Sequence, residues 1–265
     1  MLQIQGISKQ YKTGDFVQRA LDNVSLNLRD SEFVAILGPS GSGKTTLLNI
    51  IGGLDHYDSG DLVINGISTK QYKSRDWDSY RNHTIGFVFQ SYNLIPHQTI
   101  LSNVELALTI SGVSHSERRE RARKALEQVG LGEHVNKKPN QLSGGQMQRA
   151  LLCRAVISDP KLLILDEPAN FVDNRFENEL YRMLAELHGR VAIVMISHDL
   201  GTITSVVRNI VCVNRYVHRH DSNIITEEQL RNYDCPIQLI SHGKVPHTVL
   251  ASHPHDCCPH TRTEE

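Results

Sequence analysis

Hydrophobic and polar positions alternate through three early segments of the chain, residues 2–11, 20–29 and 60–69. Alternation with a period of two places the apolar side chains on one face of a strand, and Gly and Asn-Gly punctuate these segments. The pattern predicts an antiparallel sheet. Within this region, a continuous apolar run at residues 33–37 is followed by a glycine-rich stretch and a helix-forming segment. That order predicts a buried strand, a tight loop and a helix.

Helical periods replace this alternation between about residues 91 and 159. Apolar residues recur every three or four positions in 99–113 and 116–131, which predicts two helices. The second helix is rich in charge, and we interpret its charges as a solvated face rather than as a basic binding patch. The side chains turned inward are then Ala122, Leu126 and Val129.

Two more buried apolar runs follow at residues 161–168 and 191–199, with a helical stretch between them. Apolar runs that alternate with helices are typical of a parallel sheet in an α/β fold. We therefore expect an α/β fold in which a parallel core sheet carries an antiparallel β subdomain and a helical subdomain.

Composition excludes several classes of function. Lys and Arg number 28 against 29 Asp and Glu, so the net charge of −1 gives no basic footprint that would favour nucleic acid as a partner. No stretch approaches the roughly 20 apolar residues that span a bilayer, and the N-terminus does not resemble a signal peptide. The 5 scattered cysteines do not resemble a disulfide framework, so we expect reduced thiols in the cytosol.

The segment GPSGSGKT, residues 38–45, fits the phosphate-binding pattern G-x-x-x-x-G-K-[ST]. Its glycines permit backbone turns in which N–H groups point at phosphate oxygens, and the helix that follows adds its positive end. We expect Lys44 to reach the β and γ phosphates of ATP, and Thr45 to hold Mg²⁺. The candidate nucleotide-binding residues here are Gly38, Pro39, Ser40, Gly41, Ser42, Gly43, Lys44, Thr45 and Thr46.

The segment LLILDEP, residues 162–168, supplies the second half of such a site. Asp166 would bind Mg²⁺ through water, and Glu167 would polarise the water that attacks the γ-phosphate. Two acids at the end of a strand could also mark a strand that leaves the core. Their place downstream of a phosphate-binding loop favours the functional interpretation.

The pentad LSGGQ, residues 142–146, lies between these two motifs. With it, the chain resembles the ATP-binding cassette (ABC) ATPases, the motor subunits of ABC transporters, over about residues 1–215. The resemblance implies a P-loop NTPase fold with a RecA-like parallel sheet, an antiparallel β subdomain and a helical subdomain at about 91–159. Residues 216–265 would form a C-terminal extension.

The resemblance also implies site residues outside the phosphate-binding loop. Tyr11 would stack on adenine, Gln90 would contact Mg²⁺ and water, and His198 would contact the γ-phosphate. Asp173 matches the D-loop of the family, although Val172 stands where the family more often has Leu. The catalytic residues would then be Glu167, His198 and Gln90, and the Mg²⁺ contacts Thr45, Gln90 and Asp166.

In the family two cassettes meet head to tail, so that the LSGGQ of one faces the γ-phosphate held by the other. Here that surface would comprise Ser143, Gly144, Gly145 and Gln146 at the start of a helix. The resemblance implies a homodimer formed on ATP, a separate integral membrane permease as partner, and a peripheral position on the cytoplasmic face of the membrane. The alternatives are a soluble nucleotide-switched scaffold and a cassette ATPase outside transport, which usually carries two cassettes or a coiled-coil insert.

Two parts of the sequence resemble different branches of the family. Residues 1 to about 148 resemble the macrolide-exporter and lipoprotein-release branch, whereas residues about 150 to 265 resemble zinc and manganese uptake ATPases. The chain is either a divergent natural member or two cassettes joined near residues 146–151, and we favour the joined origin. The cargo would be a metal ion such as zinc or an exporter-type substrate such as a lipoprotein, peptide or macrolide. The groove for the permease is expected at about residues 88–140.

The end of the chain is rich in potential zinc ligands. Imidazole and thiolate groups suit Zn²⁺, but two prolines interrupt the segment, two of the cysteines are adjacent, and no C-x-x-C spacing occurs. Weak Zn²⁺ binding, a defined structural zinc site and an inert end all stay open, and His218 with His220 form another candidate pair. The tail candidates are His253, His255, Cys257, Cys258 and His260.

Overall fold

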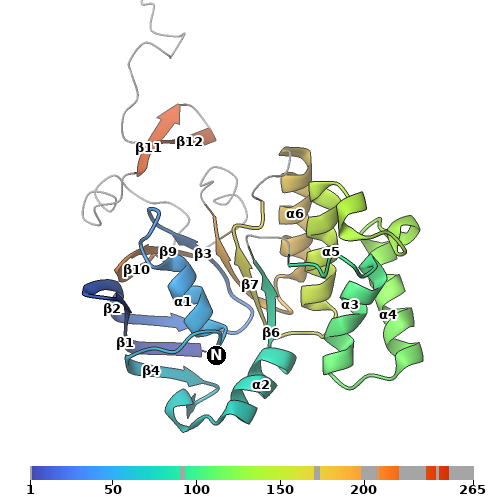
Figure 1. The fold of residues 1–265 in the computed structure, drawn as a ribbon. Coiled ribbons are helices and arrows are strands. Elements are labelled where there is room, and N and C mark those ends of the chain that lie inside the picture. Colours follow the sequence, from blue (N-terminus) through green and yellow to red (C-terminus); the bar gives the residue numbers. More distant parts are fainter. Residues whose placement is uncertain are drawn as a thin grey trace, which may run out of the picture.

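The N-terminal part of the chain forms a four-stranded antiparallel sheet, shown at the lower left of the computed structural model in Figure 1. The structure describes residues 2–89, 93–169, 174–197, 207, 209–220, 237–242 and 245–250. The strand order in this sheet is β2-β1-β4-β5. The strands are β1 (Leu2–Thr13), β2 (Phe16–Leu28), β4 (Ser59–Ile64) and β5 (Ile67–Ser68). The predicted antiparallel sheet is therefore confirmed.

A six-stranded sheet forms the centre of the molecule, in the order β10-β9-β3-β8-β7-β6. Five of its strands are parallel, and the edge strand β10 pairs antiparallel with β9. The strands are β3 (Phe33–Leu37), β6 (Ile85–Val88), β7 (Leu162–Asp166), β8 (Ala192–Ile196), β9 (Asn209–Asn214) and β10 (Tyr216–His220). This confirms the α/β fold. The division of the chain at residue 215 stays a prediction.

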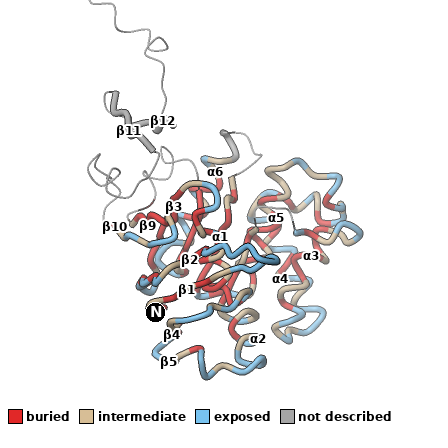
Figure 2. The backbone as a smooth tube through the Cα atoms, turned by 60° about the vertical axis from the view of Figure 1, so that its left-hand side comes forward, coloured by how far each residue is buried: buried red, intermediate tan, exposed pale blue. Residues whose placement is uncertain are grey.

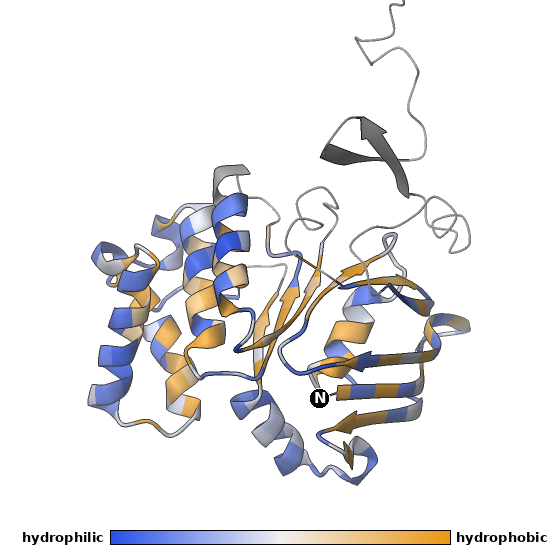
Figure 3. Ribbon diagram, turned by 180° about the vertical axis from the view of Figure 1, so that it is seen from behind, coloured by the Kyte–Doolittle hydropathy of each residue, from blue (hydrophilic) through white to orange (hydrophobic). Residues whose placement is uncertain are grey.

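Both faces of the core sheet are buried. In β3, Val34 and Ile36 pack with helix α1 (Lys44–Ile51) and the antiparallel sheet, whereas Phe33 and Ala35 pack with the helices on the opposite face. Because successive residues of a strand point to opposite faces, a strand covered on both sides must be apolar throughout. Figure 2 shows the buried residues concentrated in these central strands, and Figure 3 shows the same strands as almost wholly hydrophobic.

Helices gather beside the core sheet at the right of Figure 1. They are α3 (Ile100–Ile110), α4 (His115–Gln128), α5 (Gly144–Val156) and α6 (Asn174–Leu187), with 3-10 turns at Gly132–His134 and Pro139–Gln141. Ala122 and Leu126 on α4 are fully buried and Val129 packs against the same core, as the helical spacing predicted. Helix α2 (Ser74–His83), preceded by the 3-10 turn Thr69–Gln71, lies below β6 in Figure 1.

Smaller features complete the described structure. Strands β11 (Ile237–His242) and β12 (Val245–Leu250) pair as an antiparallel hairpin. Of the cysteines in the described ranges, Cys153 and Cys212 are buried. Within those ranges, no helix has the length and apolar composition that crossing a bilayer requires.

Candidate nucleotide-binding site

The phosphate-binding loop lies between β3 and α1, where the sequence predicted it. Gly43 caps α1 with φ 100°, and a Cβ atom there would lie 2.3 Å from the carbonyl oxygen of Ala20. Gly41 also has a positive φ, of 75°. Only glycine accepts such angles without strain, and the close approach of β2 excludes a side chain at residue 43. The first N–H groups of α1 lack acceptors within the helix, so with its positive end they form an anion site.

The side chain of Lys44 folds back onto this loop and bonds its first two residues. Its Nζ donates hydrogen bonds to the carbonyl oxygens of Gly38 and Pro39, each at 2.9 Å. The side chain is buried, and burial lowers the pKa of Lys44, although the carboxylates of Glu167 and Asp166 act in the opposite direction. The loop therefore holds a largely desolvated amine among backbone carbonyls, close to two acids.

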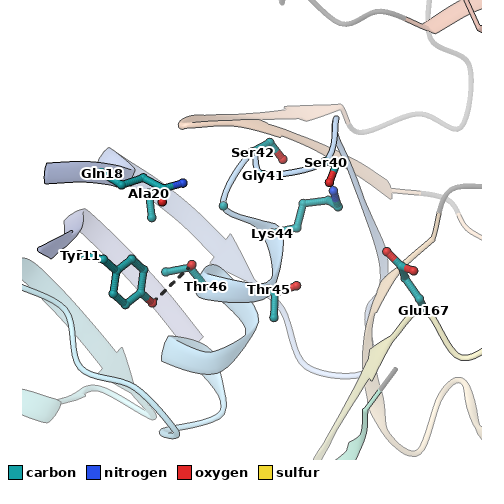
Figure 4. A pocket seen from close by; sticks show the side chains of 11 residues that line it. Tyr11, Gln18, Ala20, Ser40, Gly41, Ser42, Lys44, Thr45, Thr46 and Glu167 are labelled. Carbon is teal, nitrogen blue, oxygen red and sulfur yellow. Dashed lines mark hydrogen bonds between the residues drawn. The ribbon is translucent and has the colours of Figure 1, made fainter. Parts of the chain in front are cut away.

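A cavity of about 330 Å³ extends from β1 across this loop to the end of β7. In Figure 4, Tyr11 lies at one end, Lys44 turns back into the loop, and Glu167 faces the loop from the opposite side. Ser42 Oγ is buried in this region without a hydrogen-bond partner among the described residues. The residues that line the cavity are Tyr11, Gln18, Ala20, Ser40, Gly41, Ser42, Gly43, Lys44, Thr45, Thr46 and Glu167.

These features fit a nucleoside triphosphate better than an apolar ligand. A phosphate chain needs donors, and the start of α1, the Lys44 ammonium and the orphaned hydroxyl of Ser42 supply them from one side of the cavity. Tyr11, at the far end, is the aromatic ring of the lining and is 39% exposed. A flat base could stack on such a ring.

The two acids at the end of β7 differ in their surroundings. Asp166 is the last residue of the strand and is buried, whereas Glu167 is half-buried and lines the cavity. Glu167 has φ 49°, and its backbone N–H donates to the carbonyl oxygen of Ile196 at 3.1 Å. A residue other than glycine in this conformation is strained, and such strain gathers at functional sites. The turn directs the Glu167 carboxylate toward Lys44 and Thr45.

The LSGGQ segment occupies a different place. Ser143 is the N-cap of α5: its Oγ accepts a hydrogen bond from the Gln146 backbone N–H at 3.3 Å, and the Gln146 side chain accepts one from the Ser143 N–H at 3.0 Å. This reciprocal pair is a capping box, which fixes the start of the helix. Ser143, Gly144, Gly145 and Gln146 are all described, and none of them lines the cavity that holds Lys44.

Several predicted site residues lie outside the described residues. They are Gln90, Asp173 and His198, together with the tail residues His253, His255, Cys257, Cys258 and His260. In the part of the chain that the structure describes, no group of three or more His, Cys, Asp or Glu side chains could hold a metal ion. His218 and His220 lie on β10, where burial lowers the pKa of both imidazoles.

Two lining residues, Gln18 and Ala20, were not found by sequence reasoning. Both lie on β2, and Gln18 is paired directly opposite Tyr11 in the β1–β2 ladder. The side chains of cross-strand partners project to the same face of the sheet, so Gln18 and Tyr11 both line the cavity. The pairing of β1 with β2 has several irregularities, so the partner of Tyr11 cannot be counted from the sequence alone. Gln18 also belongs to no recognisable motif.

Comparison with known proteins identifies the family. A family model described as ABC transporter matches residues 21–170. The ABC transporter ATP-binding protein MJ0796 of Methanocaldococcus jannaschii is 39% identical in an alignment of 240 residues, which covers 88% of this chain and 99% of that protein. A dimeric structure of MJ0796 bound to ADP and Pi matches with a TM-score of 0.78 and 36% identity, over 85% of this chain and 100% of that chain. The chain belongs to the ABC transporter family, has the ABC ATPase fold, and is an ATPase.

A further relative concerns the branch within this family. The macrolide export ATP-binding/permease protein MacB of Hyphomonas neptunium is 42% identical over 201 residues, which are 75% of this chain and 31% of that protein. The match to MJ0796 covers 88% of this chain and so runs through residues 146–151, which lie in the continuous helix α5. A joined origin and the resemblance to zinc uptake ATPases have no support in these comparisons.

Proposed function

We propose that this chain is the ATP-hydrolysing motor subunit of an exporter-type ABC transporter. It forms a head-to-tail homodimer on ATP and drives a separate integral membrane permease from the cytoplasmic face of the membrane. Residues 1–215 are the ATP-binding domain, and 216–265 are an extension. One observation carries the proposal: a single cavity joins an aromatic ring, a phosphate-binding loop and a carboxylate, while LSGGQ lies outside it.

Within one chain, each lining residue has a role that follows from its chemistry. Tyr11 stacks on adenine, the N–H groups and Lys44 bind the phosphates, and Glu167 orients the attacking water and accepts its proton. Thr45 and Gln90 would hold Mg²⁺ directly and Asp166 would hold it through water, and the bound ion would neutralise charge on the phosphates. A hydroxyl, a carboxylate and an amide oxygen form the hard donor set that Mg²⁺ prefers. His198 would contact the γ-phosphate, and Asp173 would take the place of the D-loop aspartate of the family.

The position of LSGGQ explains why a second chain is needed. Its capped helix start offers N–H donors to an anion, as does the start of α1, yet the two do not share a cavity. ATP held by one chain can use both only if the LSGGQ of a partner faces its γ-phosphate. The solved structure of MJ0796, bound to ADP and Pi, is a dimer. Nucleotide then favours the dimer because it contacts both chains there.

The proposed cargo follows from the relatives. MacB is named as a macrolide export protein, and it contains a region 42% identical to this chain. We therefore favour an exporter-type substrate, such as a macrolide, peptide or lipoprotein, over a metal ion. MacB is named as both ATP-binding protein and permease, and this chain spans 31% of it. The permease that this chain drives would therefore lie outside these 265 residues.

The rate of ATP hydrolysis tests the proposal. Wild-type protein should hydrolyse ATP, whereas Glu167→Gln should bind ATP and lose about 10²- to 10⁴-fold in rate, the contribution of a positioned base. Glu120→Gln, on the exposed face of α4, is the matched control and should behave as wild type. Unchanged hydrolysis in Glu167→Gln would remove Glu167 as the base. A wild-type protein that binds ATP without turnover would indicate a nucleotide-switched scaffold.

A further inference from the structure

An ionic network lies behind the ring proposed to carry adenine. The hydroxyl of Tyr11 donates a hydrogen bond to Asp55 Oδ2 at 2.7 Å and lies 3.5 Å from Thr46 Oγ1. The other carboxylate oxygen, Asp55 Oδ1, accepts from Lys9 Nζ at 2.9 Å and from the backbone N–H of His56 at 2.7 Å. The ring thus has a fixed partner at its hydroxyl end, and this partner is itself held by two donors.

Lys9 connects the network to the strand that carries Tyr11. Lys9 and Tyr11 are two residues apart on β1, so they point to the same face, and Lys9 Nζ lies 5.2 Å from the centre of the Tyr11 ring. The Lys9 side chain is nearly buried, and its Nζ also donates to the carbonyl oxygen of His56 at 2.5 Å. A buried cation with two oxygen partners cannot move without leaving a charge unpaired.

The Asp55 segment is anchored to the phosphate-binding helix. The backbone N–H groups of Leu54 and Asp55 donate to the carbonyl oxygen of Asn49 on α1, at 2.8 and 3.2 Å. From α2, the Arg81 guanidinium donates to the carbonyl oxygen of Gly53 at 2.7 Å. Asp55 therefore moves with α1, whose first turn forms the phosphate site.

The same segment also lies along the free edge of β1. Strand β1 pairs with β4 only as far as Ser8, and beyond it the Asp58 backbone N–H donates to the Ser8 carbonyl oxygen at 2.9 Å. Asp58 Oδ2 accepts from the backbone N–H of Gln10 at 2.6 Å. Residues 55–58 thus replace a missing strand, and Asp55 adds the contact that reaches the tyrosine hydroxyl.

We propose that Asp55, held by Lys9, is a positioning residue for nucleotide binding. It fixes the orientation of the Tyr11 ring relative to α1, so that one nucleotide can contact the ring with its base and the start of α1 with its phosphates. This inference rests on the proposed role of Tyr11 as the adenine platform. A ring that is 39% exposed would otherwise sample several orientations in the free protein, and binding would have to select one of them.

The ionisation of Asp55 agrees with this role. Burial acts to raise the pKa of Asp55, but the hydrogen bonds from Tyr11, Lys9 and the His56 backbone, together with the Lys9 charge, lower it overall. The carboxylate is thus ionised at neutral pH and accepts from the phenol. Burial raises the pKa of Tyr11, so the hydroxyl keeps its proton as a donor.

Titration calorimetry with Mg·ADP and with Mg·pyrophosphate tests the inference without hydrolysis. Asp55→Ala should weaken Mg·ADP binding about fivefold, a typical effect of losing pre-organisation at one side chain, and leave Mg·pyrophosphate unchanged. Asp58→Ala is the matched control, because Asp58 bonds the same strand without touching the Tyr11 hydroxyl. It should bind both ligands as wild type does.

A double-mutant cycle separates positioning from a general structural effect. Tyr11→Phe should weaken Mg·ADP binding about as much as Asp55→Ala, and the double variant should bind no more weakly than Tyr11→Phe alone. Asp55→Asn, of nearly the same size, repeats the cycle if Asp55→Ala unfolds. Equal losses for both ligands, or losses that add in the double variant, would overturn the inference.

One further variant distinguishes this inference from the proposed function. Tyr11→Ala should weaken Mg·ADP binding more than any Asp55 variant does. If Tyr11→Ala has no effect, Tyr11 is not the adenine platform and that part of the proposed function fails. If Tyr11→Ala weakens binding and Asp55→Ala does not, only the positioning role of Asp55 fails.

Discussion

Two glycines of the phosphate-binding loop offer a matched comparison of backbone strain and steric fit. Gly41 and Gly43 both have positive φ angles, 75° and 100°. A Cβ at Gly41 would meet no atom within 4 Å, whereas one at Gly43 would lie 2.3 Å from the Ala20 carbonyl oxygen and 3.0 Å from Leu21 Cδ2. Alanine at either position brings the strain, but only Gly43→Ala also brings a collision with β2.

The expected losses follow from these two terms. The strain of a left-handed alanine is about 1–2 kcal/mol, so Gly41→Ala should lower the melting temperature by roughly 2–4 °C for a chain of this size. Gly43→Ala adds an overlap that only movement of β2 or α1 can relieve, at roughly 1–3 kcal/mol more. Its melting temperature should fall by about 4–9 °C, measured by calorimetry without nucleotide. Equal shifts for the two variants would refute the reasoning that β2 seals the loop.

Three further predictions concern the described residues away from this loop. Ser143→Ala should lose the α5 cap and about 0.5–1 kcal/mol of unfolding free energy, measured by thermal unfolding. Ser143→Asn should keep the cap and the stability of the wild type, because Asn caps a helix as well as Ser does. Burial raises the pKa of Cys153 to about 12 against 9.0 unfolded, so alkylation followed by mass spectrometry should label Cys153 only after unfolding. Since the folded state then binds more protons than the unfolded state, stability should fall as pH rises from 9 toward 12, and Cys153→Ala should reduce this fall. Arg219→Met should destabilise the chain by roughly 2–4 kcal/mol in urea, because the nearly buried Glu32 carboxylate loses its charged partner; a change below about 0.5 kcal/mol would show that the pair is not needed.

The sequence predicted those parts of the fold in which a local pattern determines the structure. The run Phe33–Leu37, the loop that follows and the helix from Lys44 are adjacent in the chain, and the structure has them in that order. The inward face of α4, with Ala122 and Leu126, followed from helical spacing alone. In both cases the residues that determine the conformation are close to one another in the sequence.

The parts that the sequence could not predict depend on pairings between distant segments. Gln18 reaches the cavity because it pairs with Tyr11, and Asp55 reaches the tyrosine hydroxyl across 44 positions of sequence. Neither residue belongs to a motif, and neither pairing follows from hydrophobic periodicity. The interpretation of the second half as part of a zinc uptake ATPase depended on short similarities, and the long match to MJ0796 runs across both halves.

If ATP completes its site between two chains, ATP must drive formation of a dimer, and sedimentation velocity measures that change. Glu167→Gln should retain bound ATP, because Glu167 follows the buried Asp166 and is proposed to act on water rather than to bind phosphate. With saturating ATP and Mg²⁺ this variant should sediment as a dimer, and without nucleotide it should sediment as a monomer. A monomer at saturating ATP would show that ATP does not join two chains.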